Sequence, residues 1–117
     1  MLEGEHHFEH PGSAAPIFAA LGDPVRLSIV RRLCEGGPLP TVQLKEVAGG
    51  VSRQGITKHL RLLEDAGLVR SSRLGRDRQW QLQAQQITAL REYLDQISAQ
   101  WGTRLERLRA LIEESDT

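Results

Sequence analysis

Residues 51–70 read VSRQGITKHLRLLEDAGLVR, and this stretch decides the fold. Ser52 has the short polar side chain that favours a helix N-cap. Ile56, Leu60 and Leu63 follow at steps of four and three, the spacing that places apolar side chains on one helix face. The stretch therefore predicts an amphipathic helix over 52–66, buried on one side and basic on the other.

The end of this helix and the segment before it predict a compact motif. Gly67 is placed to adopt the left-handed conformation, with Leu68 folding back on Leu63 in a Schellman motif. Upstream, Thr41 can cap a short helix that ends at the turn Gly49-Gly50. Two helices meeting at a short glycine turn, the second of them basic, are typical of a helix-turn-helix.

The residues after this motif alternate as strands do. The strings LVRSSRL and RQWQLQ flank a polar turn at 75–77, and they predict a β-hairpin over 68–83. Near the tip lie three basic residues: Arg73, Arg76 and Arg78.

From residue 85 to residue 114 the apolar positions again follow helical spacing. They are Ile87, Leu90, Leu94, Ile97, Trp101, Leu105, Leu108 and Ile112. A helix of this length would be a rod of roughly 45 Å, longer than the small body that carries it. Its surplus apolar stripe predicts a second copy of the chain as partner. Gly102 is a poor helix former and leaves open a bend or break there.

The N-terminal part predicts an arm and two helices. Residues 1–12 are polar and show no apolar period, so we expect a flexible arm. Ser13 can cap a helix that reaches Leu21, and Asp23 can cap a second one whose apolar stripe includes Cys34. Residues 115–117 are expected to be a frayed tail.

Length and composition limit the classes of protein that fit. The chain has 117 residues, 39% of them hydrophobic, which suits one folded domain over 13–114 behind the arm. No apolar run is long enough to cross a membrane and the N-terminus is unlike a secretory signal, so we expect a cytoplasmic protein. One cysteine allows no disulfide within the chain, and we expect Cys34 to act as a small buried hydrophobe.

Charge is distributed unevenly although the formal net charge is +0. Residues 50–80 contain seven basic and three acidic side chains, whereas residues 1–49 and 81–117 each contain four basic and six acidic ones. Clustered Lys and Arg displace counterions from a phosphate backbone whatever the charge elsewhere. The central segment thus predicts contact with nucleic acid. No paired carboxylates, activated nucleophile or phosphate-binding glycine loop indicates an enzyme, and we expect no cofactor.

A family resemblance rests on the order of the predicted helices and hairpin and on two strings, ALGDPVRLSIVRRL and SRQGITKHLRLLEDAGLV. Over about residues 14–112, the chain resembles the ArsR/SmtB family of bacterial winged-helix repressors. The resemblance implies a mainly α winged helix-turn-helix of order α-α-α-α-β-β-α. It implies a homodimer joined by the first and last helices, an inverted-repeat DNA operator, and repression relieved by an effector. In such a dimer Ile17, Phe18 and Leu21 of the first helix would join the apolar stripe, from Ile87 to Leu108, at the interface.

The family's DNA contacts match positions on the basic helix. These are Ser52, Arg53, Gln54, Thr57 and Lys58, with Arg61 one turn further along. Arg and Lys donate to guanine and Gln bonds adenine bidentately, so the residue types suit base recognition. The hairpin resembles the family's wing, in which Arg73, Arg76 and Arg78 would meet phosphate or the minor groove. His59 lies in the same helix and suits packing against the core as well as a DNA contact.

The family's usual metal sites are absent. Residues 39–44, at the place of its paired cysteines, contain no thiol, and the last helix contains no histidine. We therefore expect no metal site. Two alternatives stay open: a metal-responsive repressor that uses His6, His7 and His10 of the arm, and a dimeric protein-interaction module on the same fold. The main prediction is a sequence-specific transcriptional repressor that binds double-stranded DNA as a homodimer, its effector unidentified.

Overall fold

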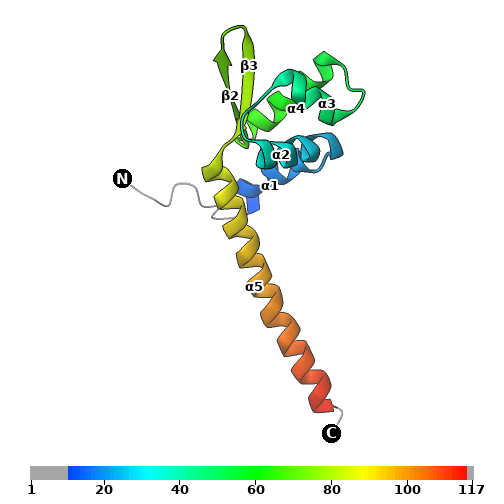
Figure 1. Cartoon of the computed structure of the whole chain (residues 1–117). Coiled ribbons are helices and arrows are strands. Elements are labelled where there is room, and N and C mark those ends of the chain that lie inside the picture. Colours follow the sequence, from blue (N-terminus) through cyan, green and yellow to red (C-terminus); the bar gives the residue numbers. More distant parts are fainter. Residues whose placement is uncertain (1–10, 116–117) are drawn as a thin grey trace, which may run out of the picture.

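The computed structural model describes residues 11–115. Along the chain it contains α1 (Pro11–Leu21), α2 (Pro24–Gly36), β1 (Leu39–Pro40), α3 (Thr41–Ala48), α4 (Arg53–Asp65), β2 (Val69–Leu74), β3 (Asp77–Leu82) and α5 (Ala84–Ser115). In Figure 1, α2, α3 and α4 form a small body, β2 and β3 project from it as a hairpin, and α5 leaves it as a single rod. The predicted class, mainly helical with a small hairpin, is confirmed.

The core forms around the apolar face of α4. Ile56, Leu60 and Leu63 are all fully buried, and α2 contributes Ile29 and Leu33 to the same cluster. Burying one such side chain stabilises a protein by about 1.5–3 kcal/mol relative to leaving it exposed. The shared core therefore fixes the orientation of α4 relative to the rest of the body.

Both ends of α4 follow the sequence prediction. The Ser52 hydroxyl oxygen accepts a hydrogen bond from the Gly55 backbone N–H at 3.0 Å. At the other end the Leu68 N–H donates to the Leu63 carbonyl at 3.0 Å, and the Gly67 N–H donates to the Glu64 carbonyl at 2.9 Å. These two bonds define a Schellman motif, which turns the chain directly into β2.

The sheet has one more strand than expected. Its three antiparallel strands are ordered β1-β3-β2, and besides the two strands of the predicted hairpin the sheet contains β1, with Leu39 paired to Trp80 and Pro40 to Gln79. Strand β1 was not expected from the sequence because two residues are too few to show the alternation of apolar and polar side chains that predicts a strand. Pro40 lacks an N–H and is tolerated because β1 lies at the sheet edge.

Three local predictions from the sequence are wrong. Helix α1 begins at Pro11, so Ser13 lies inside it and Pro11 and Gly12 do not belong to an arm; residues 1–10 of that arm lie outside the described residues. Pro40 occupies the N-cap position of α3, and Thr41 is its first helical residue. Cys34 is exposed, because α2 turns Val30 and Leu33 inward and the next residue points about 100° away.

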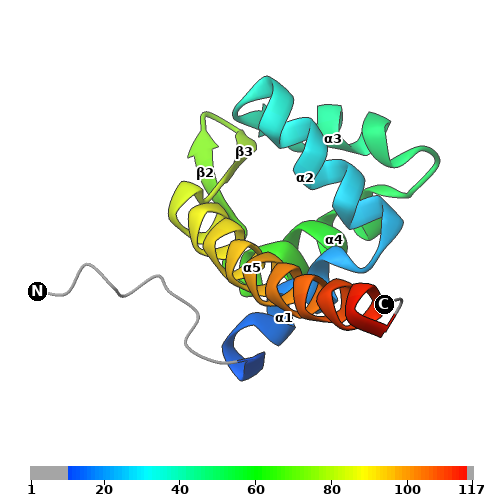
Figure 2. The same ribbon diagram turned by 90° about the horizontal axis from the view of Figure 1, so that it is seen from below.

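Helix α5 is continuous from Ala84 to Ser115, so Gly102 does not break it and Ser115 is not part of a frayed tail. Only Ala89 is buried on this helix, while Ile87 and Leu90 pack partly against the core. Beyond them the helix runs away from the body, as Figures 1 and 2 show. Its last half therefore stands in solvent with apolar side chains on it.

Helix α1 lies beside the start of α5 (Figure 1). The rings of Phe18 and Tyr93 are 6.1 Å apart between centroids, which links the two helices. Phe18 is 38% exposed, whereas Ile17 is 2% exposed and packs in the protomer core. Of the predicted interface residues on α1, Phe18 thus offers surface to a partner and Ile17 offers almost none.

Two glycines should respond to alanine in opposite directions. At Gly67, φ is +79° and an added Cβ would lie 3.1 Å from Nε2 of Gln86, so Gly67→Ala should destabilise the fold by about 1 kcal/mol. At Gly102 no atom lies within 4 Å of the added Cβ, so Gly102→Ala should stabilise α5 by up to about 1 kcal/mol. Denaturant unfolding and far-ultraviolet circular dichroism measure both effects. Equal stability of Gly67→Ala and the wild type would contradict the Schellman assignment.

Candidate nucleic-acid interface

The outer face of α4 carries polar and basic side chains at one-turn spacing. Arg53, Thr57 and Arg61 step by four residues and so lie on one side of the helix. The Thr57 hydroxyl donates to the Arg53 carbonyl at 2.9 Å, which restrains the rotamer of its side chain. Gln54 and Lys58 are exposed one residue further round, and Ser52 caps the helix. This face is therefore open to a partner along its length.

The hairpin directs a second set of arginines toward the same space. Register pairs Arg73 with Arg78 directly across the strands and Ser71 with Trp80. Because side chains alternate along a strand, these four side chains share one face of the sheet. Arg76 lies in the turn between the strands.

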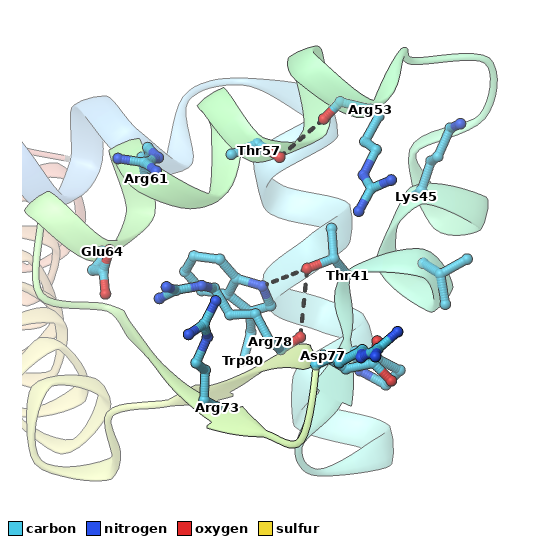
Figure 3. A pocket seen from close by; sticks show the side chains of 13 residues that line it. Thr41, Lys45, Arg53, Thr57, Arg61, Glu64, Arg73, Asp77, Arg78 and Trp80 are labelled. Atoms are coloured by element: carbon cyan, nitrogen blue, oxygen red, sulfur yellow. Dashed lines mark hydrogen bonds between the residues drawn. The ribbon is translucent and has the colours of Figure 1, made fainter.

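A hollow of about 560 Å³ separates α4 from the hairpin (Figure 3). Six of the predicted DNA-contact residues line it: Arg53, Thr57, Arg61, Arg73, Arg76 and Arg78. Ser52, Gln54 and Lys58 do not line it, although Gln54 and Lys58 lie exposed on the same helix. The structure thus brings the basic residues of the helix and of the hairpin around one concave surface.

Helix α3 contributes residues that the sequence reasoning missed. Thr41, Val42 and Lys45 line the hollow from the side opposite Glu64 of α4 (Figure 3). Lys45 lies in the short helix that the sequence predicts before Gly49-Gly50, so its positive charge could have identified it as a candidate contact for nucleic acid. The roles of Thr41 and Glu64 depend on hydrogen bonds across the fold, which no local pattern reveals.

Trp80 fixes the hairpin relative to α3. Its ring is 3% exposed, and its indole N–H donates to the Thr41 hydroxyl oxygen at 2.9 Å. A buried indole generally requires such an acceptor. The Thr41 hydroxyl in turn lies 3.5 Å from the Arg78 carbonyl oxygen, to which it donates. The base of the hairpin and the start of α3 therefore move as one unit.

The comparisons with known proteins agree with this architecture. A family model described as a helix-turn-helix domain matches residues 21–72. An HTH-type transcriptional regulator of Bacillus subtilis, YuzN, is 42% identical over 72 residues, covering 57% of this chain and 78% of the relative. The crystal structure of an ArsR-like transcriptional regulator from Rhodococcus sp. RHA1 is 31% identical with a TM-score of 0.70, over 86% of this chain and 92% of that one.

The chain belongs to the ArsR family. It is a transcriptional regulator with a DNA-binding helix-turn-helix and a winged-helix fold, and we call the hairpin of β2 and β3 the wing. A more distant neighbour, a homodimeric winged helix-turn-helix DNA-binding domain from Mycobacterium bovis, shares the fold at 19% identity, with a TM-score of 0.60 over 75% of this chain and 80% of that one.

The sequence leaves open a metal-responsive repressor that uses three N-terminal histidines. His6, His7 and His10 lie outside the described residues, and the structure gives no account of them. Within residues 11–115, no three His, Cys, Asp or Glu side chains gather closely enough to hold a metal ion. No helix in this same range is long and apolar enough to span a bilayer.

The inner edge of α4 is attached to the start of α2 by a charged cluster. Asp23 caps α2, accepting from the backbone N–H groups of Val25 at 2.9 Å and Arg26 at 3.0 Å. Nη1 of Arg26 lies 3.2 Å from Nδ1 of His59, and the Asp23 carboxylate lies 3.9 Å from that same nitrogen. His59 of α4 therefore faces α2 and contributes to positioning α4.

The hydrogen bond from the Arg26 backbone N–H lowers the pKa of Asp23 below its ordinary value of 3.8, and the charges of Arg26 and His59 lower it further. A carboxyl with a depressed folded-state pKa contributes stability that is complete above the unfolded value and disappears as pH falls through the folded one. Most of the loss of the stability that the Asp23 carboxylate contributes therefore occurs below pH 3.8.

Asp23→Asn should consequently lower the melting temperature at pH 7, and the difference from the wild type should shrink as pH falls below 3.8. Thermal unfolding followed from pH 7 to pH 2 measures this gap, with Asp95→Asn on the exposed part of α5 as the matched removal of one carboxylate. A gap that keeps the same size across this range would contradict the assignment.

Proposed function

We propose that this ArsR-family regulator is a homodimeric repressor that binds an inverted-repeat operator. The observation that carries the proposal is the hollow between α4 and the wing, around which six basic side chains converge. They are Lys45, Arg53, Arg61, Arg73, Arg76 and Arg78. Such a surface complements the phosphates that border a major groove, and α4 has the length and exposed polar face to enter that groove.

Within this proposal the contacts divide by role. Arg53, Gln54 and Lys58 lie in the first turns of α4, where a recognition helix meets base edges. Ser52 and the free backbone N–H groups at the helix start suit a phosphate. Arg73 and Arg76 of the wing are suited to the flanking backbone or a minor groove.

The apolar stripe of α5 supports the homodimer. Leu94, Trp101, Leu105, Leu108, Leu111 and Ile112 are between 44% and 63% exposed in the protomer. A patch of this kind on a long helix marks an interface, and a second copy covers it with an identical stripe. We place Phe18 and Leu21 of α1 at the margin of the same contact.

Dimer symmetry then sets the geometry of repression. Two recognition helices related by a twofold axis would enter successive major grooves about 34 Å apart, and the bound dimer would exclude polymerase. A ligand would release the operator only by binding more tightly to a dimer with a different helix spacing. A protein that acts on chromosomal DNA works in the cytoplasm, and we place it there.

Salt titration of operator binding tests the DNA interface. Binding of the purified protein to DNA from around its own gene should weaken steeply as salt rises. Arg76→Ala removes a proposed backbone contact and should reduce the log–log slope by about 0.9 for the phosphate that it no longer neutralises, whereas Arg53→Ala removes a proposed base contact and should weaken operator binding. Arg31→Ala is the matched control, because Arg31 is exposed on α2, pairs with Glu35 at 3.6 Å and does not line the hollow. Salt-independent binding would instead indicate a protein-interaction module.

The dimer interface has its own test. Leu108→Glu adds a carboxylate to the exposed stripe of α5 and should convert the dimer to monomer at micromolar concentration, since burying an unpaired charge costs several kcal/mol. Ala110→Glu adds the same charge on the opposite side of the helix and should leave the dimer intact. Sedimentation equilibrium distinguishes the two. If both variants associate equally, the dimer interface does not include this stripe.

A further inference from the structure

Glu64 is a carboxylate on the concave surface that the proposed function assigns to DNA. It lines the hollow together with Arg61 and the wing arginines. An acidic side chain in this place repels phosphate, so electrostatics alone would make it unfavourable for DNA binding. Its hydrogen-bond partners point to a second role.

The Glu64 carboxylate reaches the wing through one hydroxyl. The Ser71 hydroxyl donates to Oε2 of Glu64 at 3.2 Å, and the Ser71 hydroxyl oxygen accepts from Nη1 of Arg78 at 2.7 Å. A hydroxyl has one proton to donate and lone pairs to accept with, so both bonds form together. The three side chains form a chain of two hydrogen bonds, here called the relay, from Glu64 at the end of α4 through Ser71 of β2 to Arg78 of β3.

Sheet register explains why Arg78 needs such a restraint. Arg73 and Arg78 are direct cross-strand partners, and two like charges in that position repel each other. Both are exposed, and a free arginine side chain has about 2 kcal/mol of rotamer entropy to lose when it binds. The relay holds Arg78 beside its like-charged neighbour in the absence of DNA.

We propose that Glu64 and Ser71 are positioning residues for DNA binding, which hold the Arg78 guanidinium over the concave surface before the operator arrives. This inference rests on the proposed function, because it assumes that Arg78 meets phosphate. The relay reduces the side-chain ordering that binding requires, and this outweighs the repulsion between the Glu64 carboxylate and the DNA.

The first experiment is a double-mutant cycle in the full-length protein, using operator DNA and a salt titration. Arg78→Ala should weaken binding and reduce the salt slope by about 0.9, the value for one phosphate that is no longer neutralised. Ser71→Ala removes the relay without changing charge and should weaken binding about two- to fivefold, in line with one hydrogen bond. In the Arg78→Ala background Ser71→Ala should have no further effect.

Ser72→Ala is the matched control for this cycle. Ser72 is the next residue of β2, is exposed, and pairs with Gln79 on the opposite face of the sheet. It should bind DNA as the wild type does. Thermal unfolding of each variant measures stability separately, and a purely structural role for Ser71 would lower the melting temperature without the dependence on Arg78.

Two variants of Glu64 separate its charge from its hydrogen bond. Glu64→Gln keeps an acceptor for Ser71 and should bind DNA at least as tightly as the wild type. Glu64→Leu removes both charge and acceptor and should bind about two- to fivefold more weakly than Glu64→Gln. Equal affinity of these two neutral variants, or a Ser71→Ala effect that persists without Arg78, overturns the relay. An unaffected Arg78→Ala variant overturns the proposed Arg78 contact and the relay with it.

Discussion

The packing of one face of α4 against the core is the constraint on which the rest of the structure depends. Ile56, Leu60 and Leu63 are fully buried, so the opposite face of the same helix is fixed outward. The Schellman motif at Gly67 then delivers the chain into β2 at a set angle, with Leu68 and Val69 buried at once. The end of α4 and the start of β2 meet at this buried segment. The core therefore sets the angle between α4 and the hairpin, and with it the shape of the concave surface between them.

Side chains on two other elements secure this geometry. Trp80 connects the wing to α3 through Thr41, and the Asp23–Arg26–His59 cluster connects α4 to α2. In both places a polar group on an element that borders the concave surface attaches that element to its neighbour. These contacts hold both sides of the concave surface in place within the protomer, an arrangement that favours recognition with little rearrangement.

Sequence reasoning succeeded where the structure depends on local pattern. The N-cap at Ser52, the stop at Gly67 and the period of the last helix each depend on residues within a few positions of one another. It failed at Thr41, whose hydroxyl bonds Trp80 instead of capping α3, because that choice is made by a residue far along the chain. It failed at Cys34 because one position on a helix separates a buried side chain from an exposed one. For the candidate site, the arginines were visible as a local excess of charge, whereas Glu64 required knowledge of the register of β2.

The weak attachment of α5 to its own protomer links folding to concentration. Only Ala89 is buried on this helix, so little within a single chain stabilises its last turns. In the proposed homodimer, dilution would favour both dissociation and fraying, and stability would depend on the amount of protein present. In such a dimer, the abundance of the protein would set the fraction of its chains that are fully helical as well as the occupancy of the proposed operator.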